Sequence, residues 1–387
     1  MNDAMDGQVT RPVGYGLIGA GAFGRFCVEQ YRQLESVEPV ALADVNAEVA
    51  RASAERLGLD ACETVDTLLG RDDVDLVHVA TPPATHADVV MRALEAGKHV
   101  LCEKPLAIRL DDAKRMVDAA ASGARVLAVN LIMRYDPLCE AVKAICEQHL
   151  LGEPLHGFFE NYAKDEPLPP DHWFWNRELS GGIFIEHGVH FFDLFEWWLG
   201  DGEPAGAQQV QRPGADLIEQ VQATVRYGGA ATGPLVSFYH GFTQAARMDR
   251  QEMRLVFERG SLSLYEWVPT SMTIDCLADD PTLQALRQLL PGCDVTEVER
   301  YEQAGHREVV SRHKPYTVDG RYRLAADVGM DKDALYGHVL RALLDDKVKA
   351  IVDPSHDRRV TAANGYRSLA TADRATQLAG QAFADRS

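Results

Sequence analysis

The sequence has no apolar run that approaches the ~20 residues needed by a membrane-spanning helix, so a bilayer-embedded protein is not expected. Residues 1–12 are polar and partly acidic, without the basic start and apolar stretch of a secretory signal. The seven cysteines include no C-x-x-C pair, and such a scattered, odd set is typical of free thiols in a reducing compartment. We therefore expect a cytoplasmic protein without disulfides.

Basic residues are few relative to acidic ones. The chain has 39 Lys and Arg against 58 Asp and Glu, which gives a formal net charge of −19. An acidic surface repels phosphate backbones and anionic lipids, so neither nucleic acid nor membrane is an expected partner. The charge does not exclude a small neutral ligand. A length of 387 residues predicts two domains.

The first third of the chain alternates short β-rich runs with helical stretches. Strands are predicted at residues 15–18, 39–43, 74–80, 100–102 and 125–130, and helices at 23–34, 47–57, 87–96 and 111–121. Apolar strands that alternate with helices form parallel sheets covered on both faces. Residues 1–135 are therefore predicted to form an α/β domain of this kind.

Beyond about residue 137 the strands lengthen and apolar residues occupy every second position, most clearly over 221–227 and 253–258. This alternation predicts a second, α+β domain over residues 136–387, with a large, mostly antiparallel sheet. The open face of such a sheet is a plausible oligomer interface. Helices are predicted at 332–344 and 359–384, and these final helices are expected to pack back on the first domain. Residues 275–330 show no clear pattern.

A glycine-rich turn follows the first strand. Gly19, Gly21, Ala22, Phe23 and Gly24 belong to a G-x-G-x-x-G segment that opens a helix, which is the pattern of a Rossmann dinucleotide site. The glycines allow the backbone to approach a pyrophosphate at the helix N-terminus. A ligand-free glycine turn is the alternative.

An acidic residue supports the dinucleotide interpretation. Asp44 ends the second strand at the spacing where an acid hydrogen-bonds the adenosine ribose. A carboxylate repels a 2′-phosphate, and no arginine follows immediately. The sequence therefore predicts NAD rather than NADP as the cofactor.

Lys104 lies between Glu103 and Pro105, directly after a predicted strand. Ligands of open α/β sheets bind at the carboxyl ends of strands, where a lysine can stabilise a developing alkoxide. From this tripeptide alone, a solvated lysine paired with Glu103 remains the stronger interpretation.

Residues 181–198 form a strongly apolar segment with a polar stripe. Glu186, His190, Asp193 and Trp197 share one face of the predicted helix, and His187 points away from it. Buried ionisable groups are costly unless they are paired or functional. Glu186 is within reach to orient His190 for proton transfer. Asp193 can equally anchor the helix, and a metal held by Glu186 and His190 is a weaker alternative.

An aromatic loop precedes this segment. Trp173 and Trp175 offer flat faces that suit sugar rings, although either can equally be a packing residue. We interpret them as candidate substrate-binding residues.

Two longer segments resemble one protein family. Residues 80–86, ATPPATH, and residues 95–106, EAGKHVLCEKPL, resemble the signature of the Gfo/Idh/MocA (glucose–fructose oxidoreductase, inositol dehydrogenase) family, and residues 134–137, RYDP, match a further segment. The chain has Pro83 where this family often has Asn. It also has Glu186 at the position of the family's Asp, which puts direct substrate contact by that carboxylate in doubt.

The resemblance implies roles for individual residues. It implies that His190 is the general base, that Lys104 donates a hydrogen bond to the substrate, and that Glu186 supports them as the third catalytic residue. It implies that Arg134, Thr81, Pro82, His86, Glu103 and Lys104 join the glycine turn and Asp44 in binding the cofactor. Lys104, His190, Asp193, Trp173 and Trp175 form the implied substrate site. No metal is expected, and relatives suggest a homodimer or homotetramer.

These observations predict an NAD(P)-dependent oxidoreductase. A secondary alcohol of a sugar, cyclitol or related polyol would be the hydride donor, and the nicotinamide would be the acceptor. Two alternatives remain open at this point. One is a glycoside hydrolase or lyase that oxidises its substrate transiently with tightly bound NAD. The other is a regulatory protein that binds NAD without catalysis.

Overall fold

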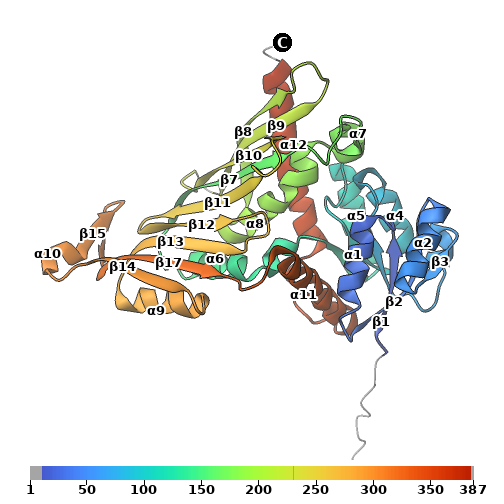
Figure 1. Cartoon of the computed structure of the whole chain (residues 1–387), viewed down its shortest axis with the longest axis horizontal. Helices are drawn as coiled ribbons and strands as arrows, with labels where there is room; N and C mark the ends of the chain where they lie inside the picture. The colour runs from blue at the N-terminus through green and yellow to red at the C-terminus, as the bar shows by residue number, and fades with distance from the viewer. Residues whose placement is uncertain (1–10, 230, 385–387) are drawn as a thin grey trace, which may run out of the picture.

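The computed structural model describes residues 11–229 and 231–384, and two large sheets dominate it (Figure 1). The first sheet is parallel, with the strand order β3-β2-β1-β4-β5-β6. Its strands are β1 (Val13–Ile18), β2 (Val37–Ala43), β3 (Asp60–Cys62), β4 (Leu76–Val79), β5 (His99–Cys102) and β6 (Leu127–Val129). The predicted doubly wound α/β fold is confirmed. The chain changes direction across the sheet between β1 and β4, which is where such sheets bind ligands.

Helices connect these strands and cover both faces of the sheet. They are α1 (Ala22–Tyr31), α2 (Ala47–Leu57), α3 (Val65–Leu69), α4 (His86–Glu95) and α5 (Leu110–Ser122). Asn46 starts α2 by accepting hydrogen bonds from the backbone N–H groups of Glu48 and Val49. The sequence did not predict β3 or α3, because elements of three and five residues are too short to show a period.

The second sheet is larger and mostly antiparallel. Its order is β14-β17-β13-β12-β11-β7-β10-β9-β8, and only the β7–β10 neighbours run parallel. The strands are β7 (Pro154–Lys164), β8 (Gly202–Gln211), β9 (Ile218–Tyr227), β10 (Leu235–Gln244), β11 (Arg250–Phe257), β12 (Gly260–Tyr265), β13 (Ser271–Ala278), β14 (Asp294–Arg300) and β17 (Gly320–Asp327). The predicted alternation is present: every second residue of β13 is buried.

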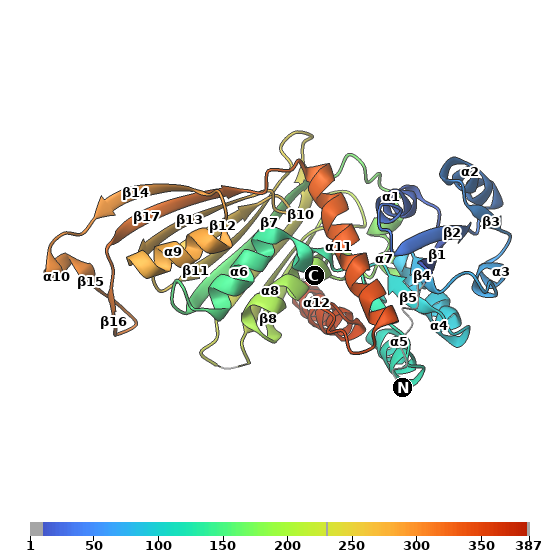
Figure 2. The same ribbon diagram turned by 90° about the horizontal axis from the view of Figure 1, so that it is seen from below.

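One face of this sheet is covered by α6 (Pro137–Glu147), α8 (Val189–Leu199), α9 (Asp280–Leu289) and α12 (Ala362–Ala384), as Figure 2 shows. The long helix α11 (Lys332–Val352) lies against α1, where Arg341 Nη1 donates to Gln30 Oε1 at 2.5 Å. In α12, Gly365 approaches Val129 of β6 so closely that a Cβ atom would lie 2.4 Å from its side chain. Oligomer formation through the opposite face stays a prediction. Within the described ranges, no helix is both long and apolar enough to cross a membrane.

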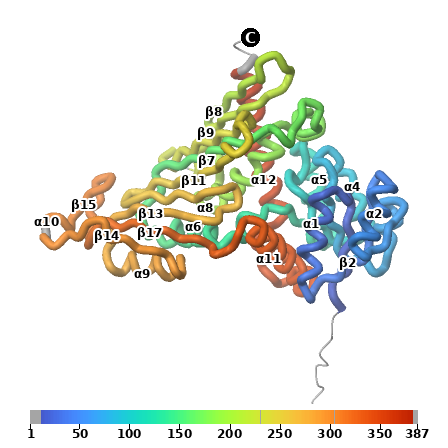
Figure 3. Tube along the Cα trace, viewed as in Figure 1, coloured from blue at the N-terminus to red at the C-terminus, as the bar shows by residue number. Residues whose placement is uncertain are grey.

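Residues beyond β13, where the sequence showed no clear pattern, build the far end of the molecule (Figure 3). After α9 and β14 come the short helix α10 (Ala304–Arg307) and the hairpin of β15 (Glu308–Ser311) and β16 (Lys314–Thr317). Arg312 and His313 turn the hairpin with positive φ values of 50° and 63°.

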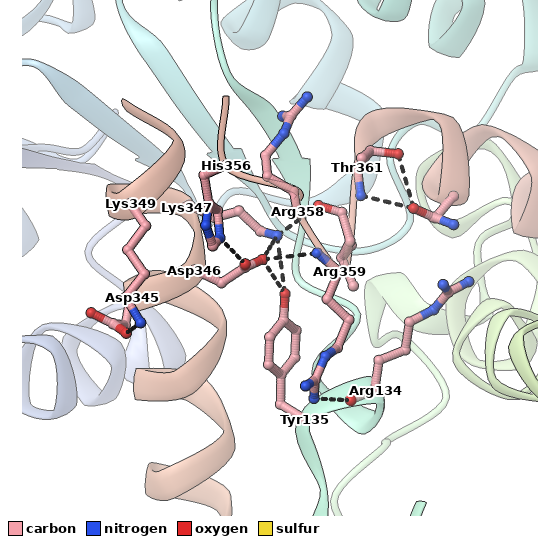
Figure 4. Close-up of polar contacts among 12 residues, drawn as sticks. Arg134, Tyr135, Asp345, Asp346, Lys347, Lys349, His356, Arg358, Arg359 and Thr361 are labelled. Carbon is pink, nitrogen blue, oxygen red and sulfur yellow. Dashed lines mark hydrogen bonds and ion pairs between the residues drawn. The ribbon is translucent and has the colours of Figure 1, made fainter. Parts of the chain in front are cut away.

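A buried lysine ties α11 to the segment that joins the two sheets (Figure 4). Lys347 is 0% exposed, and its Nζ donates to Tyr135 Oη at 3.0 Å and to the Val360 carbonyl at 2.6 Å. It also pairs with Asp346 at 2.5 Å, and that carboxylate accepts from Tyr135 Oη and contacts His356 Nε2. Burial lowers the pKa of Lys347 to about 8.

Replacing Lys347 by Met should destabilise the fold by about 3 kcal/mol, because it leaves the half-buried Asp346 carboxylate and the Val360 carbonyl without their shared, fully buried donor. The measurement is the free energy of unfolding in urea. Lys349→Met is the matched control: its ion pair with Asp345 is exposed, so the change should stay within about 0.5 kcal/mol. Equal losses in the two variants would contradict the assigned role.

Candidate active site

The glycine-rich turn lies between β1 and α1 as predicted. Gly19 has φ of 96°, and a Cβ there would lie 2.5 Å from the Ala80 carbonyl oxygen, so only glycine fits. Gly24 packs beneath it, where a Cβ would lie 2.3 Å from the Gly19 carbonyl oxygen. Gly21 precedes Ala22, the first residue of α1, and a Cβ at Gly21 would meet nothing within 4 Å. The turn thus presents a helix N-terminus to open space, which suits an anion.

Asp44 is held against this turn. Its Oδ2 accepts from Ala20 N at 2.8 Å and its Oδ1 accepts from Asn46 N at 2.9 Å. These two backbone bonds fix the carboxylate at the end of β2, beside the fully exposed Val45. The position is the one predicted for contact with an adenosine ribose.

A cavity of about 1020 Å³ extends from this turn to the second sheet. The first-sheet side contributes the carboxyl ends of its strands. The second-sheet side contributes residues of β7, of β11 and of the helical turn at Phe184–Gly188. Its walls include Gly19, Gly21, Phe23, Asp44, Thr81, Pro82, Glu103, Lys104, Asn130, Asn161, Trp173, Glu186, His187, His190, Gln251, Trp267 and Tyr336.

The lysine of the E-K-P segment reaches across this cavity. Lys104 Nζ lies 2.6 Å from Glu186 Oε1 and donates to the Glu186 carbonyl oxygen at 2.8 Å. The alternative of a solvated lysine paired with Glu103 is therefore wrong. Glu103 instead accepts from Asn130 Nδ2 and contacts His78 Nε2, each at 2.8 Å.

Glu186 lies on a π-helical turn, η4 (Phe184–Gly188), which precedes α8. A π turn widens the helix by one residue, and such turns are frequent at functional sites. Glu186, His187 and His190 all line the cavity. The prediction that His187 points away from the site was wrong, because residues three apart on a helix lie on neighbouring parts of one face.

His190 is 6% exposed and stands on the cavity wall. Burial, followed by the charge of Lys104, lowers its pKa well below the usual histidine value. The ring is therefore neutral at pH 7 and can accept a proton. Its Nδ1 has no hydrogen-bond partner within the described part of the chain. The expectation that Glu186 orients His190 is corrected here, since the Glu186 carboxylate is bonded to Lys104.

Three residues predicted to touch ligands are engaged elsewhere. The Arg134 guanidinium forms a two-pronged pair with Asp193, at 2.8 and 2.7 Å, and both side chains are buried away from the cavity walls. This pair supports the alternative of Asp193 as an anchor of α8. His86 is 0% exposed, and its ring nitrogens lie 2.8 Å from the Pro105 and Thr81 carbonyl oxygens. It braces the two loops that carry Lys104 and Thr81.

The two candidate tryptophans, Trp173 and Trp175, line different cavities. Trp173 lines the large cavity. Trp175 lines a different hollow of about 300 Å³ on the other side of η4, and its Nε1 donates to the Leu168 carbonyl oxygen. The prediction of a substrate contact is corrected for Trp175, because the short helix η3 (Trp173–Trp175) turns the two rings apart.

Several cavity residues were not predicted. Asn161 and Gln251 are buried neighbours across β7 and β11, and Trp267 and Tyr336 come from loop and helix positions distant in sequence. Asn130 could have been found, because it follows an apolar strand at the carboxyl edge of the sheet. The others depend on the register between strands, which the sequence alone does not give.

Two buried amides match a polar ligand. Asn130 Oδ1 and Asn161 Nδ2 have no partner within the described residues, although both side chains line the cavity and are at most 2% exposed. Buried polar atoms are usually hydrogen-bonded, so these atoms are available to a ligand. With the glycine turn and Asp44 at one end, the residues present fit a dinucleotide and a polar substrate beside it.

Comparison with known proteins agrees with this geometry. Residues 13–131 match the description "Oxidoreductase family, NAD-binding Rossmann fold", and residues 139–263 match the "GFO/IDH/MocA C-terminal domain". The fold and site define a Rossmann-type oxidoreductase that binds a nicotinamide dinucleotide. More specifically, the chain belongs to the Gfo/Idh/MocA family.

Individual relatives share the family and differ in their reactions. The chain is 33% identical to dTDP-3,4-didehydro-2,6-dideoxy-alpha-D-glucose 3-reductase of Streptomyces violaceoruber over 236 residues, covering 59% of this chain and 65% of that protein. It is 33% identical to 1,5-anhydro-D-fructose reductase of Ensifer adhaerens over 237 residues, covering 59% and 69%. The chain spans only half to about two thirds of the length of the curated relatives it matches.

A solved structure shows the same fold over nearly the whole chain. Levoglucosan dehydrogenase in complex with NADH and L-sorbose has a TM-score of 0.76 at 20% identity, covering 96% of this chain and 98% of that one. At this identity the likeness concerns the fold alone.

Removing the carboxylate in Asp193→Ala should cost about 3–5 kcal/mol of folding stability, because it strands a buried guanidinium. Urea unfolding measures the loss. Glu29→Ala, which breaks the exposed pair with Arg56, is the control and should change stability by less than about 1 kcal/mol. An Asp193→Ala variant that unfolds like the wild type would show that the pair is not structural.

Proposed function

We propose that this protein transfers a hydride reversibly between a secondary alcohol of a sugar, cyclitol or related polyol and NAD. The observation that carries the proposal is the meeting of Lys104 and His190 on one cavity, which also contains the glycine turn and Asp44. The reductases and the dehydrogenase named above act on, or are bound to, carbohydrates, and this supports the substrate class.

His190 and Lys104 have different roles at the substrate oxygen. The neutral imidazole of His190 accepts the hydroxyl proton as the alcohol is oxidised. The ammonium of Lys104 donates to the same oxygen and stabilises the negative charge that develops on it. When bound, NAD supplies the hydride acceptor of the reaction.

Glu186 acts on Lys104 rather than on His190. Its carboxylate and its carbonyl both accept from Lys104 Nζ, which aims the ammonium into the cavity. The longer side chain, where relatives carry Asp, thus serves to hold the lysine. Positioning of this kind contributes to rate because reacting groups are already oriented when substrate binds.

The substrate end of the cavity favours a neutral, hydroxyl-rich molecule. Trp173 and Trp267 provide flat apolar walls, and Asn161 and Gln251 provide amide donors and acceptors between them. Lys104, the cation at this end, is already paired with Glu186. This arrangement suits a sugar or cyclitol ring better than a highly charged ligand.

We expect the purified protein to reduce NAD when it is given one member of a panel of aldoses, inositols and glycosides. His190→Ala and Lys104→Ala should each lower kcat by about 10²-fold or more, since general-base and oxyanion contacts contribute at that level. The readout is reduced-nicotinamide absorbance. Full turnover in both variants would refute the roles. Glycoside cleavage without net NADH would replace the dehydrogenase with a hydrolase or lyase.

Asp44 should set the choice of cofactor. Asp44→Ala removes the carboxylate that repels a 2′-phosphate, so kcat/KM with NADP should rise relative to that with NAD by about tenfold or more. Asp60→Ala, an exposed acid on the neighbouring strand, is the control and should leave the ratio unchanged. If the Asp44→Ala variant has the wild-type ratio of kcat/KM with NADP to kcat/KM with NAD, Asp44 does not determine the choice of cofactor.

A further inference from the structure

A carboxylate, that of Glu103, is buried on the cavity wall without a lysine or arginine partner among the described residues. Glu103 follows β5, is 8% exposed and lines the cavity next to Lys104. Within residues 11–229 and 231–384, no Lys or Arg nitrogen forms an ion pair with it, and its neighbour Lys104 is committed to Glu186. A buried charge of this kind is costly unless something compensates for it.

A chain of hydrogen bonds supports Glu103 from behind. His78, on β4, is 0% exposed, and its Nε2 lies 2.8 Å from Glu103 Oε1. Its Nδ1 lies 2.7 Å from Tyr15 Oη on β1. Because the Tyr15 hydroxyl can donate to Nδ1, the imidazole proton is on Nε2 and is donated to the carboxylate. Asn130 Nδ2 donates to the same oxygen at 2.8 Å.

The other groups around this chain are uncharged. Burial raises the pKa of the Tyr15 and Tyr31 hydroxyls and of the Cys27 thiol well above their usual values. Cys27, His78 and Glu103 each bring a possible ligand atom to within 4.8 Å of the others. His78 Nε2 is, however, occupied by its bond to Glu103, and a protonated thiol is a poor metal ligand. The cluster therefore presents one negative charge, on Glu103, to the cavity.

We propose that Tyr15 and His78 are positioning residues that hold the Glu103 carboxylate facing the cavity, so that the site binds oxidised nicotinamide in preference to reduced nicotinamide. The oxidised ring carries a positive charge that the reduced ring lacks, and a carboxylate in a low-dielectric cavity attracts it. Donated hydrogen bonds stabilise the charged form of a carboxylate. This inference rests on the proposed placement of the nicotinamide beside Lys104 and His190.

The sequence places polar residues at two strand positions where apolar residues are usual. His78 stands within an apolar, fully buried strand, Leu76–Val79, where an aliphatic residue would pack at no polar cost. Tyr15 is likewise buried in β1, and among the described residues its hydroxyl bonds His78 alone. Two aliphatic residues would fill these buried positions without polar atoms that need hydrogen bonds. The polar pair that is present contacts Glu103 through His78.

The test compares two substitutions of similar size at His78. His78→Leu removes the donor to Glu103, whereas His78→Gln retains an N–H group that can replace it. Dissociation constants for NAD⁺ and for NADH are measured by calorimetry. In His78→Leu, the ratio of the NAD⁺ constant to the NADH constant should rise about tenfold, the loss expected for one hydrogen bond to a charged group. In His78→Gln the ratio should return to within about twofold of the wild-type value.

Two further variants complete the design. Tyr15→Phe should shift the ratio in the same direction by a smaller factor, because the imidazole then loses the partner that fixes its proton on Nε2. His99→Gln changes a histidine on β5 that bonds the Val126 backbone and does not line the cavity, so its ratio should equal that of the wild type. A general loss of stability weakens both nucleotides together and leaves the ratio unchanged.

An unchanged ratio in a folded His78→Leu variant would overturn the proposal. So would stoichiometric zinc in the purified wild type, because a cation in the cluster would already neutralise Glu103. Failure of the proposed oxidoreductase function would give a result distinct from failure of the Glu103 proposal. The wild type would bind neither nucleotide, or would bind both and turn over no alcohol.

Discussion

The contact between Lys104 and Glu186 joins two parts of the chain that lie 82 residues apart in sequence. The lysine follows a strand of the parallel sheet, and the carboxylate belongs to the helical segment that covers the other sheet. Their 2.6 Å separation fixes how the two walls of the cavity face each other. His190 follows Glu186 by four residues, so this ion pair contributes to the position of His190 relative to the glycine turn.

The pair is supported on both sides by polar groups that do not touch the cavity. Arg134 and Asp193 hold α8 against the segment between the sheets, and His86 braces the loop after Pro105. Lys347 ties α11 to the same segment through Tyr135. Each of these groups is buried and bonded, which is the condition under which a polar residue stabilises an interior. These contacts surround a cavity in which Asn130 Oδ1 and Asn161 Nδ2 have no partner among the described residues.

Charge is distributed unequally within that cavity. Asp44 faces the end where the glycine turn presents backbone N–H groups, while Glu103 lies at the inner end beside the reacting groups. Asp44 is proposed to select NAD by repelling a 2′-phosphate, and Glu103 is proposed to act on the charge of the nicotinamide. A carboxylate acts most strongly on a nearby charge where water is excluded, as it is at the buried Glu103.

Much of this could be read from the sequence. The glycine spacing, Asp44 and the alternation of strands and helices predicted the first sheet, since each is a local pattern with a local cause. The family resemblance of the E-K-P segment and of residues 181–198 implied the roles proposed for Lys104, Glu186 and His190. The partners of those residues were not predictable in the same way. His187 lines the cavity together with His190, and strand register brings Asn161 and Gln251 to its wall.

The sequence by itself determined the parallel sheet, the alternating strands over 221–227 and 253–258, and the glycine-rich turn, because period and spacing act over a few residues. Only the tertiary structure decided which charges pair: Arg134 with Asp193, Lys104 with Glu186, and Glu103 with His78. Those pairings join residues from 25 to 82 positions apart, and they follow from how the sheets and helices pack, which no local pattern encodes.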